Sequence, residues 1–334
     1  MIVELARTTR FAVISDTHFY APGSQGKDAL CWNRVLQTRT DAIAQALLEV
    51  IRDLAPDFVV HCGDITGLCE MANWEFACQI MDQLPCPWYA VLGNHDTWFA
   101  GVRDAFSARF GAPAGPCYYG RDLGGIRFLF LDVAGWYDRA GRFSPYLDKE
   151  AYDSGRIAGI GPEPAQLAWL AAELTACGAR GIPIVLVSHA PLGFRPAYPV
   201  ATLPKGRRPA SAQTAIEEIM EDIVPRQALR RLVGRHPCVR LALAGHWHIN
   251  DAIQLDGVTY CQTASLREYP FEVRVADYRD GALAFRTVNL PDARLREWSY
   301  VPEWRNEWVA GGAEDRTFRV SLRAGPGETR EGVV

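Results

Sequence analysis

The sequence contains no pair of cysteines separated by two residues, and its nine cysteines follow no regular spacing. This absence excludes a zinc ribbon, and an odd number of scattered cysteines does not predict a disulfide framework. We therefore expect free thiols and a reducing compartment. No apolar run approaches the ~20 residues of a membrane-spanning helix, and no apolar segment of the signal-peptide type precedes residue 11. These absences predict a cytoplasmic protein that does not enter a membrane.

An excess of positive charge is also missing, because 35 Lys and Arg residues stand against 39 Asp and Glu residues, a net charge of −4. This balance argues against a protein that tracks along nucleic acid or binds a membrane surface through a global field. Apolar residues make up 49% and charged residues 22% of the 334 residues, which is typical of a globular protein with a sizeable core. A phosphate-bearing ligand would therefore need a local site.

Short apolar runs rich in β-branched residues recur along the chain. They occupy residues 11–15, 58–62, 88–92, 126–131, 182–187 and 239–244. Continuous apolar runs of this length fit strands that are buried on both faces, and helix-patterned stretches separate them, so the pattern predicts an α/β fold. The expected helices cover residues 36–54, 161–174, 209–224 and 225–235. Alternating segments after residue 250, joined at Asp256-Gly257 and Asp280-Gly281, predict antiparallel hairpins that add to or pack on the main sheet.

Five of the apolar runs end in polar residues of one restricted kind. These residues are Asp16, His18, Asp64, Asn94, His95, Asp96, His189, His246 and His248. The carboxyl ends of strands in an open α/β sheet lie along one edge, so we expect these side chains to meet there. A single such residue is more often a turn or capping residue, but five of the seven histidines fall at these strand ends. The donors suit metal ions, and their number fits two ions bridged by one carboxylate better than one tetrahedral ion.

The ordered blocks Asp-x-His, Gly-Asp, Gly-Asn-His-Asp, His and Gly-His-x-His, between residues 16 and 248, resemble the calcineurin-like metallophosphoesterases. The flanking stretches "GDITGLCEMANWEFA" and "GIGPEPAQLAWLAAEL" are similar to those of the bacterial class III cyclic-nucleotide phosphodiesterase branch. The resemblance implies a four-layer α/β/β/α sandwich, in which helices flank two central mixed sheets. The purple acid phosphatase branch places a metal-binding tyrosine shortly after Gly-Asp, and no tyrosine stands there in this sequence. We therefore do not expect a coloured iron–tyrosinate centre.

The resemblance also implies a role for each block. One metal ion would be held by Asp16, His18, Asp64 and His248, and a second by Asp64, Asn94, His189 and His246; the residues do not distinguish Mn, Fe and Zn. A hydroxide shared by the two ions would attack phosphorus. His95 would contact the phosphate or protonate the leaving group, and Asp96 would orient the imidazole of His95. His61 and His236 are interpreted as structural.

The expected reaction is hydrolysis of small nucleotide-type phosphodiesters such as cyclic nucleotides. A nucleotide-sugar or pyrophosphate hydrolase and a glycerophosphodiester hydrolase are alternatives on the same metal site. A metal-poor protein-binding scaffold is less favoured, because every block is intact. Arg195, Arg207 and Arg208 would bind a second phosphate, although charged loop residues are usually only solvated.

The domain prediction places the catalytic domain at residues 1–290. Residues 291–334 would form a C-terminal extension that is not an independent domain. Trp298, Trp304 and Trp308 lie there among charges, so the extension would act as a cover, a lid or a dimer contact. A homo-oligomer is compatible with this interpretation.

Overall fold

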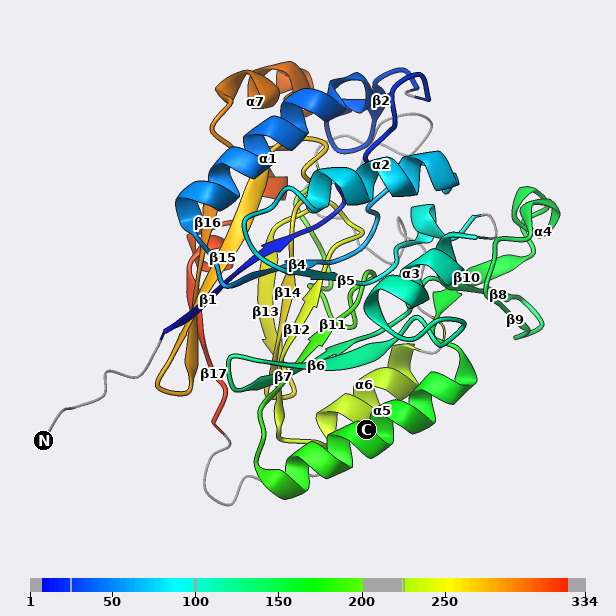
Figure 1. Ribbon diagram of the computed structural model, residues 1–334, viewed down its shortest axis with the longest axis vertical. Coiled ribbons are helices and arrows are strands. Elements are labelled where there is room, and N and C mark those ends of the chain that lie inside the picture. The colour runs from blue at the N-terminus through cyan, green and yellow to red at the C-terminus, as the bar shows by residue number, and fades with distance from the viewer. Residues whose placement is uncertain (1–7, 25, 99–100, 201–223, 225, 324–334) are drawn as a thin grey trace, which may run out of the picture.

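Two six-stranded mixed sheets pack face to face between two layers of helices in the computed structural model (Figure 1). The structure describes residues 8–24, 26–98, 101–200, 224 and 226–323. The helix predicted over 209–224 lies outside the described residues, apart from residue 224. The predicted α/β/β/α sandwich is confirmed.

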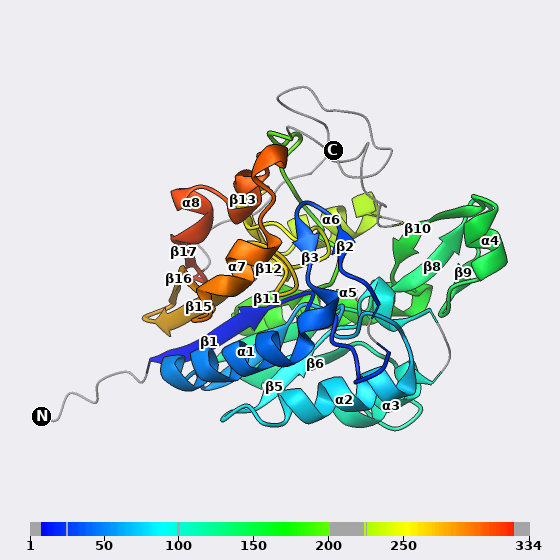
Figure 2. The same cartoon turned by 90° about the horizontal axis from the view of Figure 1, so that it is seen from above.

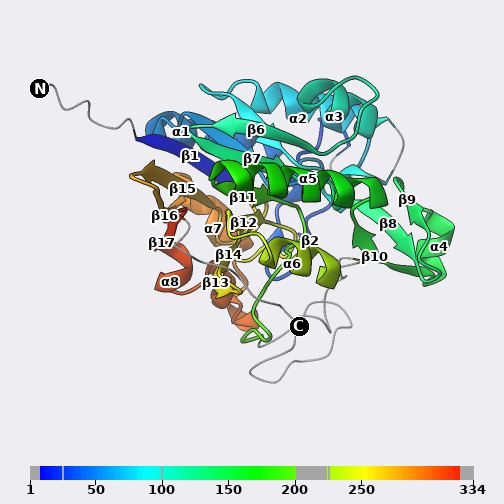
Figure 3. The same ribbon diagram turned by 90° about the horizontal axis from the view of Figure 1, so that it is seen from below.

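The first sheet has the strand order β17 (Phe318–Ser321), β16 (Ala282–Asn289), β15 (Glu272–Arg279), β1 (Thr9–Ile14), β4 (Phe58–His61) and β5 (Trp88–Ala90). The second has the order β13 (Asp251–Leu255), β14 (Val258–Gln262), β12 (Val239–Ala244), β11 (Ile184–Val187), β7 (Ile126–Phe130) and β6 (Tyr119–Leu123). Helices α1 (Thr40–Leu54) and α2 (Met71–Met81) lie outside the first sheet, with α3 (Val102–Phe110) beside them. Helices α5 (Pro164–Arg180) and α6 (Arg226–Gly234) cover the second (Figure 3).

Aromatic side chains join the two sheets. The ring of Phe11 in β1 stacks on Phe58 of β4 at 5.1 Å and meets the edge of Phe128 of β7 at 5.4 Å. Phe11 and Phe128 are fully buried, and burial of a side chain of this size stabilises the fold by about 2–3 kcal/mol. The apolar runs form strands because both of their faces have a partner layer.

The two predicted hairpins are confirmed, and they join different sheets. Asp256 and Gly257 have φ angles of 51° and 72°, and Asp280 and Gly281 have 55° and 80°, as a type I′ turn requires. Strand β14 runs parallel to β12 in the second sheet, whereas β15 runs antiparallel to β1 in the first. The alternating pattern specifies the hairpins but not which sheet receives each one.

Three regions add smaller elements to this frame. Residues 135–161 contain β8 (Gly135–Asp138), β9 (Phe143–Ser144) and β10 (Ile157–Gly161), which form a small third sheet beside the main layers, and the helix α4 (Lys149–Asp153) (Figure 2). Strands β2 (Ala29–Leu30) and β3 (Arg34–Val35) form a short hairpin. After residue 291, α7 (Ala293–Ser299) and α8 (Ala313–Arg316) precede β17, which pairs with β16. None of the described helices is both long and apolar enough to cross a bilayer.

Candidate metal centre

The loops that follow β1, β4, β5, β11 and β12 meet at one edge of the two sheets. Backbone hydrogen bonds hold the first two loops together, because the N–H of Asp16 donates to the carbonyl of Gly63 and that of His18 to the carbonyl of Asp64, both at 3.0 Å. The N–H of Gly245 donates to the carbonyl of His189 at 2.9 Å in the second sheet. Parallel pairing of β1, β4 and β5, and of β11 and β12, brings these strand ends to the same side.

Five of the predicted metal ligands have a left-handed backbone. Their φ angles are 51° for Asp16, 42° for His18, 52° for Asp64, 70° for His246 and 57° for His248. This conformation costs an L-residue roughly 1–2 kcal/mol, and such strain concentrates at functional sites. The neighbouring glycines allow close approach, since a Cβ on Gly93 would lie 2.1 Å from Oδ1 of Asp64 and one on Gly245 would lie 1.7 Å from Oγ of Ser15.

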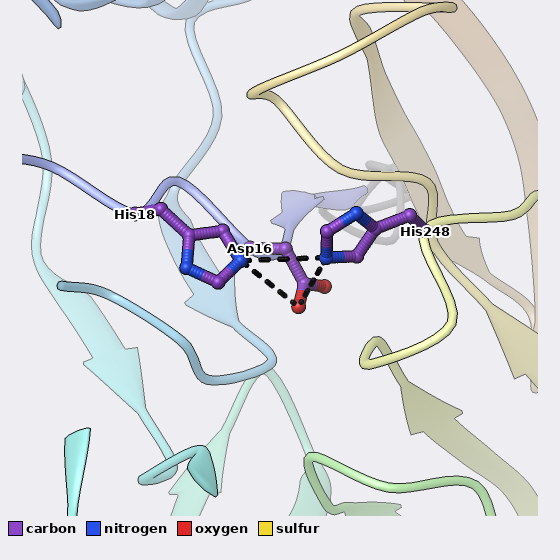
Figure 4. A group of neighbouring side chains, drawn as sticks. All are labelled: Asp16, His18 and His248. Atoms are coloured by element: carbon purple, nitrogen blue, oxygen red, sulfur yellow. Dashed lines mark hydrogen bonds and ion pairs between the residues drawn. The ribbon is translucent and has the colours of Figure 1, made fainter. Parts of the chain in front are cut away.

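One group of ligand atoms comes from Asp16, His18 and His248 (Figure 4). The Nε2 atoms of the two histidines are 3.3 Å apart, and Oδ1 of Asp16 lies 3.4 Å from Nε2 of His248. The other oxygen of Asp16 accepts hydrogen bonds from Oγ of Ser15 at 2.5 Å and from the N–H of His246 at 3.0 Å. Oδ1 of Asp16 is buried and has no hydrogen-bond partner, so it is free to bind a cation.

A second group surrounds His189, which is fully buried. Its Nε2 atom lies 3.0 Å from Oδ1 of Asn94, 3.2 Å from Nδ1 of His246 and 3.3 Å from Oδ2 of Asp64. The structure thus brings all seven predicted ligands together at the strand ends. Amide, imidazole and carboxylate donors of this kind fit divalent Mn, Fe or Zn.

Asp64 lies between the two groups. Its Oδ2 atom faces Nε2 of His189 at 3.3 Å and Nε2 of His18 at 3.7 Å. Its Oδ1 atom accepts a hydrogen bond from the N–H of His95 at 2.9 Å, which fixes the carboxylate. One oxygen directed toward both groups is the arrangement that a bridging carboxylate requires.

Hydrogen bonds on the far side of two histidines set their tautomers. Nδ1 of His189 lies 2.8 Å from the carbonyl oxygen of Cys62, and Nδ1 of His248 lies 2.5 Å from Oε1 of Glu268. A carbonyl or carboxylate oxygen only accepts, so each Nδ1 carries a proton, and each Nε2 is the nitrogen available to a metal ion at the cluster. Sequence reasoning missed Glu268, because no motif accompanies it and only its nearness to His248 in the chain points to it.

The ionisation of the cluster favours binding of positive charge. Burial opposes ionisation of Asp16, but His248 and His189 outweigh it and lower the pKa of this carboxyl to about 2. Burial lowers the pKa of His246 to about 3, so its imidazole is neutral at pH 7. For His189, the carboxylates of Asp64 and Asp16 outweigh burial and raise the pKa to about 9. A metal ion would replace the proton that these carboxylates attract.

His95 lies at the rim of the cluster and is partly exposed. Its Nδ1 atom is 3.3 Å from the carbonyl oxygen of Gly67. The ring meets His18 edge-on at 4.8 Å and stacks on Trp98 at 5.2 Å with an interplanar angle of 25°. A backbone carbonyl and an aromatic face therefore hold this imidazole next to the ligand atoms.

The position of Asp96 differs from the expected one. Its buried carboxylate accepts hydrogen bonds from the backbone N–H groups of Gly93 at 2.9 Å, Ile65 at 3.2 Å and Thr66 at 2.9 Å. Burial raises the pKa of this carboxyl to about 6. Asp96 thus ties the loop that carries Asp64 to the loop that carries Asn94, and it does not contact the imidazole of His95. The sequence interpretation placed it in the right region with the wrong partner.

The expectation that Arg195 binds substrate phosphate is not supported by its contacts. Its guanidinium pairs with the buried carboxylates of Asp251, at 2.5 Å, and Asp315. These ion pairs tie the chain before residue 200 to the region around α8. Arg207 and Arg208, the other two predicted phosphate ligands, lie outside the described residues.

Replacing Arg195 with alanine tests this structural role. We expect a loss of about 1–3 kcal/mol in the free energy of unfolding, because two buried carboxylates lose their partner while the guanidinium itself is partly exposed. Chemical denaturation measures the loss. A fall in substrate affinity with unchanged stability would instead restore Arg195 as a substrate ligand.

The fold and the donor cluster define a metal-dependent phosphoesterase. The chain belongs to the calcineurin-like phosphoesterase family, because the model of that family matches residues 9–250, well over half of the sequence. No curated protein is significantly similar to this sequence.

Solved structures support the fold. A dimetal phosphatase from Danio rerio has a TM-score of 0.61 and 18% identity, covering 84% of this chain and 97% of that chain. A purple acid phosphatase from yellow lupin (Lupinus luteus) seeds has a TM-score of 0.51 and 16% identity, covering 87% of this chain and 53% of that chain. At these identities the likeness establishes the architecture alone.

Proposed function

We propose that this protein hydrolyses phosphodiester bonds in small nucleotide-type substrates, such as cyclic nucleotides, with two divalent metal ions. The observation that carries the proposal is the position of Oδ2 of Asp64, which faces ligand atoms of both groups. Asp16, His18 and His248 would hold one ion with Asp64, and Asn94, His189 and His246 the other. The flanking sequences that resemble class III phosphodiesterases support the choice of diester substrate.

The residues of the chain have distinct tasks in this reaction. Bound metal ions would supply Lewis acidity, which makes water nucleophilic near neutral pH and offsets charge on phosphoryl oxygens. A ring nitrogen of His95 lies within 4.8 Å of ligand atoms of His18 and Asp64, which is close enough to serve a phosphate held at the cluster. His95 would donate a hydrogen bond to a phosphoryl oxygen or a proton to the leaving alkoxide. Asp96 holds the loops that carry Asp64 and Asn94 in a fixed position relative to each other.

Other substrates fit the same metal centre. A nucleotide-sugar, a pyrophosphate or a glycerophosphodiester exposes the same phosphoryl group, so these remain the alternatives within the enzyme class. The intact set of ligands argues against a metal-poor scaffold. None of the nine cysteines, all within the described part of the chain, forms a disulfide bond, which supports the proposal of a cytoplasmic location. A homo-oligomer stays a prediction that light scattering checks.

A metal-removal assay tests the proposed function. We expect the Mn²⁺-loaded protein to hydrolyse bis(p-nitrophenyl) phosphate, a chelator to abolish the activity, and added Mn²⁺ to restore it. The same preparation is then assayed with cyclic nucleotides, nucleotide sugars and glycerophosphodiesters. The highest kcat/KM should fall on a cyclic nucleotide. Hydrolysis that survives complete removal of metal would contradict the proposal, and higher kcat/KM on another class would replace the substrate.

A further inference from the structure

We propose that Glu268 is a positioning residue for His248, and that the described part of the C-terminal extension, residues 291–323, holds Glu268 in place through the loop between β2 and β3. The inference rests on the proposed metal centre. It assigns a task to a residue outside the motifs and to the segment that follows the matched family region.

Glu268 is fully buried, and both of its carboxylate oxygens are used. Oε1 accepts the Nδ1 proton of His248 at 2.5 Å, and Oε2 accepts the backbone N–H of Asn33 at 2.7 Å. The adjacent Arg267 does not neutralise it, because its guanidinium donates to Oγ1 of Thr40 at 3.0 Å and the carbonyl of Gln37 at 2.9 Å. Among the described residues, Glu268 forms no ion pair with lysine or arginine. His248 is the side chain that can offer positive charge to this carboxylate, and the Sγ atom of Cys31 lies within 4.8 Å of the ligand atoms of both.

This contact fixes both the proton and the ring plane of His248. With Nδ1–H donated to Glu268, Nε2 is the nitrogen left to bind a metal ion beside Asp16 and His18. A hydrogen bond to a charged acceptor is stronger than one to a neutral acceptor, and it makes the opposite nitrogen a better donor to a cation. In contrast, His189 relies on the carbonyl of Cys62 for the same purpose. A histidine of one group is thus oriented by a carboxylate, and a histidine of the other by a backbone carbonyl.

The loop that carries Asn33 is held from the C-terminal extension. The backbone N–H of Val301 donates a hydrogen bond to Oδ1 of Asn33 at 3.1 Å, and Nδ2 of Asn306 donates one to the carbonyl of Trp32 at 2.8 Å. The indole of Trp32 meets that of Trp308 at 5.1 Å with an interplanar angle of 72°. Three residues of the extension therefore hold the segment whose backbone amide binds Glu268.

The same loop is tied to the chain next to His248. Nε1 of Trp32 donates to the carbonyl of Trp247 at 2.7 Å. The N–H of Asn250 donates to the carbonyl of Val309 in a short helix of the extension, Glu307–Ala310, at 2.8 Å. The extension thus contacts both the residues that hold Glu268 and the residues that flank His248. Loosening it should weaken one half of the metal centre only.

Manganese titration of the full chain tests the inference. We expect Glu268→Gln to weaken binding of one equivalent of Mn²⁺ by ~10–100-fold and to leave the other unchanged, as measured by calorimetry and by electron paramagnetic resonance of free Mn²⁺. Asp132→Asn is the matched control, because Asp132 is also a buried carboxylate but pairs with Arg103 instead of a ligand or the extension. The control should bind both equivalents as the wild type does.

Two further variants keep the test decisive if Glu268→Gln does not fold, which thermal unfolding of the metal-free protein shows. Glu268→Asp keeps the charge, but its side chain is too short to reach both partners. It should therefore weaken binding of the same equivalent of Mn²⁺, by a smaller factor than Glu268→Gln does. Asn306→Ala should also weaken binding of that equivalent, because it loosens the loop between β2 and β3 that holds Glu268. Wild-type affinity in Glu268→Gln or Glu268→Asp overturns the role of Glu268, and wild-type affinity in Asn306→Ala overturns that of the extension. A wild-type protein that binds no Mn²⁺ contradicts the proposed function instead.

Discussion

Replacing Asp64 with alanine is expected to remove both metal ions and to lower phosphodiester hydrolysis by ~10³-fold or more. Asp64 faces His18 of one group and His189 of the other through a single oxygen, so its loss removes a ligand from both ions at once. It also frees the backbone of His95, which the second oxygen holds at 2.9 Å.

The purified variant is equilibrated with micromolar Mn²⁺, and its metal content is measured together with its rate of hydrolysis. Asp132→Asn is a suitable control, because Asp132 is also a buried aspartate near the end of a strand, but it pairs with Arg103. The control should keep its metal even if its stability falls. An Asp64→Ala protein with full metal content would refute the bridging role.

Replacing His95 with alanine is expected to have a different signature. Both metal ions should remain, and kcat should fall by ~10²–10⁴-fold, the usual contribution of a positioned acid or base. The reason is the location of His95 at the partly exposed rim, where the carbonyl of Gly67 and the ring of Trp98 hold its imidazole beside the ligand atoms.

The metal content and kcat of His95→Ala are measured together with those of His236→Ala. His236 lies near the end of α6 and is interpreted as structural, so its replacement should leave kcat unchanged. Turnover of His95→Ala at the wild-type rate would remove His95 from the mechanism. Loss of metal would instead make it a ligand.

The layers and the metal ligands were predictable from the sequence because they depend on local patterns. An apolar run buried on both faces implies a strand in the middle of a sandwich, and the polar residue after it must lie at the sheet edge. Asp16 and His189 are 173 positions apart, yet each is specified by the strand that precedes it. The type I′ turns were equally local, since Asp-Gly favours two positive φ angles.

Contacts between distant segments were not predictable in the same way. The basic loop around Arg195 favours a substrate ligand, but the partners of Arg195, Asp251 and Asp315, are 56 and 120 positions away. The motif suggests His95 as the partner of Asp96, whereas the carboxylate of Asp96 accepts hydrogen bonds from backbone N–H groups about 30 positions earlier. Glu268 belongs to no motif at all. Side chains whose partners come from another loop leave no periodic or spacing signal.

Anomalous diffraction from crystals of the Mn²⁺-loaded protein tests the account most directly. We predict two peaks about 3.5–4 Å apart, on either side of Oδ2 of Asp64. His18 and His248 should contact one peak, and His189 and His246 the other. A single peak, or two peaks with the Asp64 carboxylate bound to only one of them, would contradict the account.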